Sequence, residues 1–384
     1  MSTPSLLLAL AACHSGTDPA PAIGEAVLVV GGEGDRLALV DGTAGRVVAR
    51  PGPVARTKSA AALAPDGSVA YLSLLGASKG NELAALEPRS GRFRWRLALT
   101  DPGSTATRVG GFLVYGSALG VSPDGARIFL GNALRPEDQA HPLDSARVAV
   151  LDAATRRLVG TLGPLSVMPD GLATLPAGPA APHGAVLAVA ARRRGVSPSL
   201  DWLFVIDPAT LAVVDSAAVT APADDAGGTL RRLVVAPDGR RVYLVSRGGG
   251  LVAYDPAARA VVGRAQGPEQ AWLAVAPDGQ RLYASDPGTF AAPGGGRVLV
   301  FGPELQSLGA IDLSAAAAVD GVPPSTHGLA VSRDGARLYV AAGTASAGGY
   351  PAQPQRLLVV DVAQGTLGRA VALDDYGPAR VYVP

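Results

Sequence analysis

Cysteine and histidine are scarce in this sequence, and their scarcity excludes several kinds of site. Only one of the 384 residues is a cysteine, Cys13, so the chain can form neither an internal disulfide nor a thiolate metal centre. Its four histidines, His14, His141, His183 and His327, are far apart in the repeat pattern described below. We therefore expect no histidine-rich zinc or copper site, and we predict neither a bound metal nor a cofactor.

An excess of charge of either sign is also absent. The chain has 33 lysines and arginines against 32 aspartates and glutamates, which leaves a formal net charge of +1. Such a balance produces no strong field that would attract nucleic acid or an anionic membrane surface. We therefore predict no nucleic-acid partner.

Long hydrophobic runs are missing as well. The apolar run 6–12 near the N-terminus is far shorter than the roughly 20 residues that a membrane-spanning helix needs. It ends in the tetrapeptide Leu-Ala-Ala-Cys (10–13), which resembles the lipobox of bacterial lipoproteins, where cleavage precedes acylation of the cysteine. The resemblance implies a lipoprotein-type signal peptide over 1–12, lipidation of Cys13 and a flexible tether over 13–24. A plain signal peptide or a chance match is the alternative. Either kind of signal peptide predicts export to the cell envelope, at the periplasmic or outer-membrane face.

What the sequence does contain is a repeated hairpin. An apolar stretch, a tight turn and a second apolar stretch recur as "ALAPDGSVAYL", "GVSPDGARIFL", "RLVVAPDGRRVYLV", "LAVAPDGQRLYA" and "LAVSRDGARLYV". A sixth copy, "APHGAVLAV", has His183 in the aspartate position. Proline and aspartate favour the corners of the turn and glycine supplies its positive φ, so each copy predicts two antiparallel strands.

Each hairpin is followed by a third strand, such as "LFVID" or "LLVVD", then by a second tight turn and a fourth strand. One unit is thus a four-stranded antiparallel meander, and a series of such units is a β-propeller. Six complete units run from about residue 59 to residue 373. The two ends of the chain supply a seventh, with three strands from 25–51 and one from 378–384.

The predicted fold class is therefore all-β: one seven-bladed β-propeller over 25–384, closed by pairing of the C-terminal strand with the N-terminal strands. The pattern "PDGxRxY" followed by a short "VVD" strand resembles the YVTN or YncE-like propellers of bacteria. Related propellers include sugar lactonases, amine dehydrogenase subunits and surface-layer proteins. The resemblance implies the fold and no particular activity, since no catalytic motif of the enzymatic members matches.

Loop lengths indicate where a site would lie. The first-to-second and third-to-fourth turns of each blade are tight, so one face of the propeller is closely trimmed. The opposite face carries the longer connections: 131–146, 191–201, 286–296 and 342–356 within blades, and 100–115 and 314–326 between blades. We call these the trimmed face and the long-loop face. Because binding residues gather on loops held by a rigid scaffold, we place the site on the long-loop face.

Residues just before each innermost strand should surround the channel mouth on that face. Counting back from the turns selects a mixed polar set suited to a small polar ligand: Lys58, Asp170, Arg231, Gln270, Trp272 and His327. A water-filled channel mouth without a ligand is the alternative. His327 as a base oriented by Asp170 would make a hydrolase geometrically possible.

We therefore predict an exported, lipid-anchored, monomeric propeller that binds a protein or a small polar ligand through its long-loop face without catalysis. A channel-site enzyme, most plausibly a lactonase-like hydrolase, is one alternative, and a surface-layer or adhesion protein is another.

Overall fold

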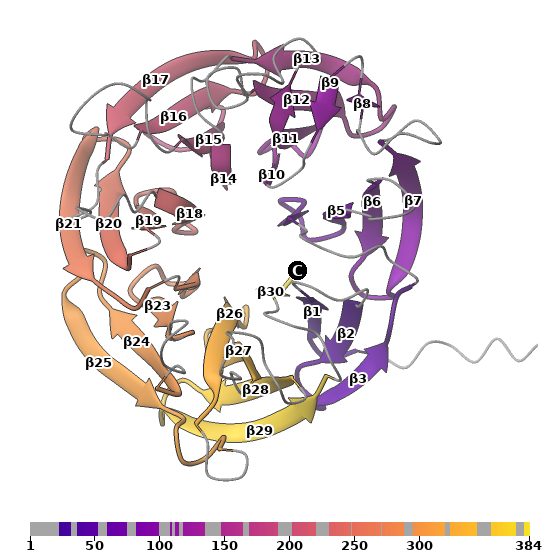
Figure 1. Ribbon diagram of the computed structural model, residues 1–384. Coiled ribbons are helices and arrows are strands. Elements are labelled where there is room, and N and C mark those ends of the chain that lie inside the picture. The colour runs from indigo at the N-terminus through magenta and orange to yellow at the C-terminus, as the bar shows by residue number, and fades with distance from the viewer. Residues whose placement is uncertain are drawn as a thin grey trace, which may run out of the picture.

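The computed structural model describes most of the chain from residue 23 onward. The described residues are 23–31, 37–52, 60–74, 82–99, 108–109, 112–114, 118–134, 147–163, 169–190, 202–219, 230–246, 248–269, 271–287, 295–318, 323–343, 355–373 and 380–384. Their regular secondary structure consists of β-strands in seven antiparallel sheets arranged around a central axis (Figure 1). Within these ranges no helix has the length and apolar character to cross a membrane. The predicted seven-bladed propeller is confirmed.

The blades follow chain order, each with its first strand innermost (Figure 1). Blade 1 consists of β30 (Arg380–Tyr382), β1 (Ala26–Val30), β2 (Leu37–Asp41) and β3 (Arg46–Ala49). Blade 2 consists of β4 (Ala61–Leu63), β5 (Ala70–Leu74), β6 (Glu82–Glu87) and β7 (Arg92–Ala98). Blade 3 is built on β10 (Leu119–Val121), β11 (Arg127–Leu134), β12 (Arg147–Asp152) and β13 (Leu158–Leu162).

The remaining blades repeat this plan. Blade 4 consists of β14 (Pro169–Leu175), β15 (Ala185–Ala190), β16 (Trp202–Asp207) and β17 (Ala212–Ala218). Blade 5 consists of β18 (Leu230–Val235), β19 (Val242–Ser246), β20 (Gly250–Asp255) and β21 (Ala260–Gln266). Blade 6 consists of β22 (Leu273–Val275), β23 (Leu282–Ser285), β24 (Arg297–Phe301) and β25 (Ser307–Asp312), and blade 7 of β26 (Ser325–Val331), β27 (Arg337–Gly343), β28 (Arg356–Asp361) and β29 (Thr366–Ala372).

Blade 3 differs from the others by an additional hairpin. The sequence suggested only a long connection over 100–115, but β8 (Arg108–Val109) and β9 (Phe112–Val114) form a pair there. Strand β9 pairs with the far end of β11, where Ala133 and Leu134 lie opposite Val114 and Leu113. β11 bulges between Leu130 and Ala133 and continues beyond β10. The hairpin pairs with the edge of β11 that β10 does not reach.

The repeated turns form as the residue types predict. In the first-to-second turns the aspartate side chain accepts the backbone N–H two residues ahead, for example Ser68 to Asp66 at 2.9 Å and Arg240 to Asp238 at 3.0 Å. The following glycine has φ of +69° at Gly67 and also at Gly239. The motif is therefore a backbone device, and its aspartates are occupied with local hydrogen bonds.

The hydrophobic core is divided among the contacts between blades. The described residues form seven clusters, and each joins two neighbouring blades around the ring. The aromatic residues of the repeat, Tyr71, Phe129, Tyr243, Tyr283 and Tyr339, each lie in the cluster between their own blade and the next. Second strands such as β5 and β19 are buried along their whole length because a neighbouring blade covers each face.

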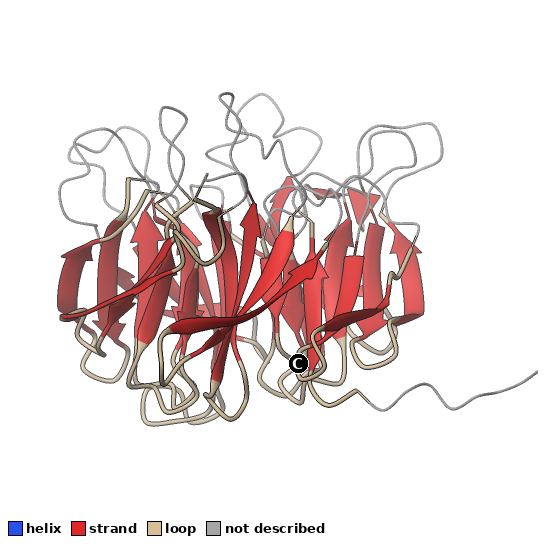
Figure 2. Ribbon diagram, turned by 90° about the horizontal axis from the view of Figure 1, so that it is seen from below, coloured by secondary structure: helices blue, strands red, loops and turns tan. Residues whose placement is uncertain are grey.

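The ring closes as predicted, by pairing of the two ends of the chain. β30 is antiparallel to β1, with Val30 opposite Arg380, Val29 opposite Val381 and Leu28 opposite Tyr382. The C-terminus lies on the side of the short turns, next to β1 (Figures 1 and 2). One blade therefore contains the first and the last strand of the protein, and no sheet is left open between blades 7 and 2.

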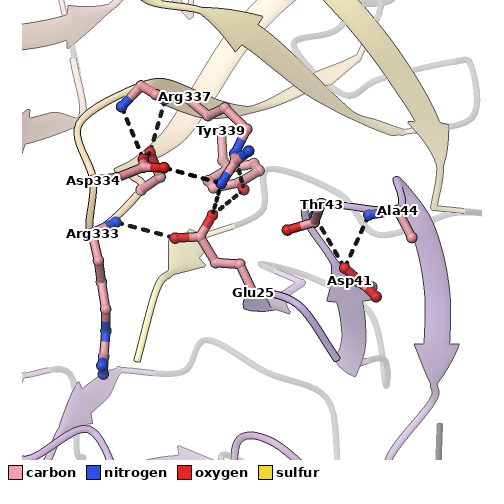
Figure 3. Close-up of polar contacts among 10 residues, drawn as sticks. Glu25, Asp41, Thr43, Ala44, Arg333, Asp334, Arg337 and Tyr339 are labelled. Atoms are coloured by element: carbon pink, nitrogen blue, oxygen red, sulfur yellow. Dashed lines mark hydrogen bonds and ion pairs between the residues drawn. The ribbon is translucent and has the colours of Figure 1, made fainter. Parts of the chain in front are cut away.

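A polar network strengthens this closure on the trimmed face (Figure 3). The Glu25 carboxylate accepts hydrogen bonds from the Arg333 backbone N–H at 3.1 Å, the Arg337 guanidinium at 3.3 Å and the Tyr339 hydroxyl. Burial and the neighbouring Glu25 carboxylate raise the pKa of Tyr339, so its hydroxyl stays protonated and donates. Glu25 thus attaches the start of blade 1 to the first hairpin of blade 7.

We expect Glu25→Ala to lower the free energy of unfolding by roughly 1–3 kcal/mol, because it removes a partly buried acceptor from an arginine and a tyrosine. Denaturant unfolding measures the change. The matched control is Arg240→Ala, which breaks an exposed 3.8 Å pair with Asp238 and should leave stability unaltered. Equal effects of the two substitutions would contradict a closing role for Glu25.

Candidate functional site at the channel mouth

A cavity of about 420 Å³ lies on the propeller axis and is lined by residues of all seven innermost strands. Each of these strands pairs on one side only, so its other edge faces the channel. The strands run from the long-loop face, where they begin, to the trimmed face, where the repeated turns lie. A residue at the start of an innermost strand therefore lies at the long-loop end of the channel.

One equivalent position of the repeat forms a ring around this cavity. It lies six residues before the turn aspartate in five blades, at Ala60, Ala118, Arg232, Trp272 and Gly328. In the two blades whose turn differs or is missing, the strand register puts Gly171 and Arg380 at the same level. All seven residues line the cavity. The ring has four small members and three large ones, and the large ones come from blades 5, 6 and 1.

The three large members converge. The guanidinium carbon of Arg232 lies 3.7 Å from the centre of the Trp272 ring, and that of Arg380 lies 5.0 Å from it. Arg232 also donates from Nη1 to the Ala271 carbonyl oxygen at 2.9 Å. Cations over an indole ring are attracted by its negative π-face. The contact thereby links blades 5, 6 and 1 across the channel mouth.

Trp272 is held from behind by a buried serine. Its backbone N–H donates to Ser285 Oγ at 2.9 Å, and its carbonyl oxygen accepts the Ser285 N–H at 3.0 Å. Ser285 has no exposed surface. The backbone of Trp272 is therefore fixed against the second strand of its own blade, as a binding platform requires.

Three of the innermost strands bulge immediately before the ring position. The register shifts between Pro169 and Gly171 in β14, between Leu230 and Arg232 in β18, and between Thr326 and Leu329 in β26. Bulges re-aim side chains and are common beside functional sites.

His327 lies at one of these bulges and is 9% exposed. Burial, together with the positive charge of Arg232, lowers the pKa of His327 from 6.5 to about 4. The imidazole is thus neutral at physiological pH and a weak base, which makes it poorly suited to general-base catalysis there.

The sequence-predicted site residues are distributed as follows. Trp272 occupies the ring position of blade 6, and His327 directly precedes the ring position of blade 7. Asp170 and Arg231 lie at the bulges of β14 and β18, with side chains outside the described part of the structure. Lys58, Gln270 and Cys13 lie outside the described residues, as do most of the long connections. Their functional roles stay predictions.

Arg232 and Arg380 were missed by the sequence reasoning. In blades 4, 5 and 7 the residue predicted from the sequence directly precedes the ring position in the chain. Arg380 escaped because the C-terminal strand has no turn from which to count. A signal was present in blade 5, where Arg232 follows the selected Arg231 directly.

A second cavity, of about 380 Å³, lies between blades 4 and 5 on the trimmed face and includes Pro176, Arg240 and Arg241. Arg241 is paired there with Asp255 at 2.6 Å and lies 3.7 Å from Glu304. These contacts are typical of packing between blades. Nowhere in the described ranges do three histidine, cysteine or acidic side chains gather closely enough to hold a metal ion.

Comparison with known proteins supports the fold. No protein-family model matches the chain, and no curated protein matches it significantly. Among solved structures it is similar to hydrazine synthase of Kuenenia stuttgartiensis, at 16% identity and a TM-score of 0.52, over 81% of this chain and 85% of that one. The dihydro-heme d1 dehydrogenase NirN, in complex with DHE, matches at 15% identity and 0.52, over 94% and 75%. U3-55K matches at 12% and 0.50, over 82% and 80%.

At these identities the likeness shows the β-propeller fold alone. The YVTN or YncE-like resemblance is not confirmed by a family match and stays a prediction.

The depressed pKa of His327 should make stability depend on pH. The unfolded chain takes up a proton near pH 6.5 and the native state only near pH 4, so lowering the pH through this window favours unfolding. The loss in the free energy of unfolding should reach about 3 kcal/mol at the acidic end of this window. Above the window there is no loss, because His327 is neutral in both the native and the unfolded state.

Denaturant unfolding of the wild type and of His327→Gln at pH 7.5 and pH 4.5 measures this difference. The variant should lose less stability on acidification than the wild type does. His183→Gln, which alters an exposed histidine, should behave like the wild type. Identical pH dependence in His327→Gln and wild type would show that His327 is not desolvated.

Proposed function

We propose that this chain is an exported, lipid-anchored β-propeller that acts as a non-catalytic binding module and receives a small ligand at the channel mouth on its long-loop face. The observation that carries the proposal is the convergence of Arg232 and Arg380 on Trp272 at one end of a cavity of about 420 Å³. Concave sites of several hundred Å³, with apolar walls and a few convergent polar groups, are typical of small-molecule binding.

The described residues at the channel mouth favour binding over turnover. Among them His327 is the histidine, and its pKa of about 4 disfavours the role of base that a lactonase-like hydrolase would require. Tryptophan and arginine recognise ligands but supply no nucleophile, and the backbone around Trp272 is fixed by Ser285. Binding without chemistry is what this arrangement supports best.

The position of Glu25 favours a definite orientation for an anchored protein. Glu25 is held against blade 7 on the trimmed face, so a tether over 13–24 would leave from that face. Twelve residues reach at most roughly 40 Å when extended. An acyl group on Cys13 would therefore keep the trimmed face toward the bilayer and leave the channel mouth directed away from it.

Ligand binding is tested by thermal unfolding in the presence of matched small molecules that are anionic, neutral or cationic. We expect at least one class to raise the melting temperature of the wild type and to lose this effect in Trp272→Ala, because mass action stabilises only a protein that binds. Trp95→Ala, which removes a tryptophan packed against Tyr71 at the periphery of blade 2, serves as the control and should keep the ligand effect.

Absence of any stabilising ligand would contradict the binding function. Hydrolysis of members of a lactone panel, abolished in His327→Gln, would replace it with the enzymatic alternative.

Lipid anchoring is tested separately by Cys13→Ser in the full chain expressed in a bacterium. We expect the wild type in the membrane fraction with a mass increased by acyl chains, and the variant in the soluble fraction without them. Two or more acyl chains on the cysteine would hold the protein at a bilayer stably, whereas a single chain would bind only reversibly. Equal partitioning of the two proteins would refute the anchor and leave the binding function untouched.

A further inference from the structure

The channel mouth is chemically divided into two halves. Arg380, Arg232 and Trp272 occupy the ring positions of blades 1, 5 and 6, while Ala60, Ala118 and Gly171 occupy those of blades 2, 3 and 4. In blade 7 the position is a glycine, Gly328, between Trp272 and Arg380 in the blade order. The seven blades share one backbone plan, so this division arises from side chains alone. A ligand that fits it has a polar end and an apolar end.

The polar half carries two guanidinium groups beside a single indole. Both lie within 5.0 Å of the Trp272 ring centre, which places two positive charges close together. An anion between the two groups is attracted by both positive charges. The planar guanidinium also matches the oxygen geometry of carboxylate and phosphate groups, to which it donates in pairs.

The apolar half leaves space for the remainder of the ligand. Alanine and glycine at the ring leave the channel open there, and Leu119 and Leu172 add apolar surface to the cavity wall. Trp272 lines the same cavity and adds aromatic surface to its wall. Among the described residues that line the cavity there is no aspartate or glutamate, whereas Arg232 and Arg380 are both positively charged.

Building on the binding function above, we propose that the ligand of the channel mouth is an amphipathic anion with a carboxylate or phosphate head held by Arg232 and Arg380. Its compact apolar body lies in the half of the cavity that the small residues of blades 2 to 4 leave open. The site thereby selects against neutral and cationic molecules of the same shape.

Calorimetric titration of full-length Cys13→Ser protein tests this without detergent, since the variant lacks the site of lipidation. The probes are benzoate, benzamide and benzylamine, which share a ring and differ in charge, together with phenyl phosphate and acetate. We expect benzoate or phenyl phosphate to bind at least tenfold more tightly than benzamide, and benzylamine not to bind. The comparison of benzoate with phenyl phosphate decides between a carboxylate and a phosphate head group. Acetate lacks the phenyl ring, so its affinity relative to that of benzoate measures the contribution of the phenyl ring.

Arg232→Gln and Arg380→Gln should each weaken binding of the preferred anion roughly tenfold or more, because each removes charge-assisted hydrogen bonds. Arg380→Lys keeps the positive charge but not the planar guanidinium. Its affinity for the preferred anion should lie between those of the wild type and Arg380→Gln. Arg92→Gln, which removes one positive charge from exposed strand β7, is the matched control and should bind like the wild type. Unchanged melting temperatures without ligand establish that the variants are folded.

The outcomes separate this inference from the function on which it rests. Benzamide or benzylamine binding as tightly as the anions, with loss in Trp272→Ala, would overturn the anion assignment and retain a binding site. Anion binding unaffected by both arginine substitutions would also overturn it. Failure of every class of ligand to bind would remove the proposed function itself.

Discussion

The burial of both faces of every blade against its two neighbours is the constraint on which this structure depends. A single blade has two apolar surfaces and no core of its own, so its hydrophobic free energy is realised only at contacts with other blades. The seven described clusters are these contacts, and together they replace a central core. Because the apolar contacts lie between neighbouring blades, the axis of the molecule needs no packed core and remains a channel.

This arrangement separates stability from specificity. The turn aspartates and glycines recur because the backbone demands them, and the aromatic residues recur because each fills the layer before the next blade. Neither the backbone geometry of a turn nor the packing between blades determines which residue occupies the ring position at the channel mouth. It holds alanine in two blades, glycine in two, and arginine, tryptophan and arginine in the others, so chemical identity varies where packing permits it.

Much of the fold follows from local sequence signals. The "PDG" turn is a short-range feature, and its repetition with three further strands per unit is enough to predict blades and their closure. The hairpin β8–β9 was not predicted, because the two strands are short and owe their pairing to the extended end of β11. The candidate site was found only in part. Trp272 follows from counting, but most of the other selected residues lie one or two positions before the ring, because the sequence does not show at which residue each innermost strand reaches the cavity. Arg380 joins the site solely through the pairing of β30 with β1, which is the longest-range contact in the sheet topology.

The sharing of blade 1 between both ends of the chain also determines when the protein can be complete. Blades 2 to 7 are contiguous in sequence and can form in order as the chain emerges from a ribosome or a translocation pore. β1 to β3 emerge first and yet must wait for the final residues, 380–382, before their sheet has its inner strand. Until then two apolar blade faces remain exposed to solvent and to proteases. Arg380 is part of β30, so the channel mouth acquires its second arginine only when β30 has been synthesised and has paired with β1.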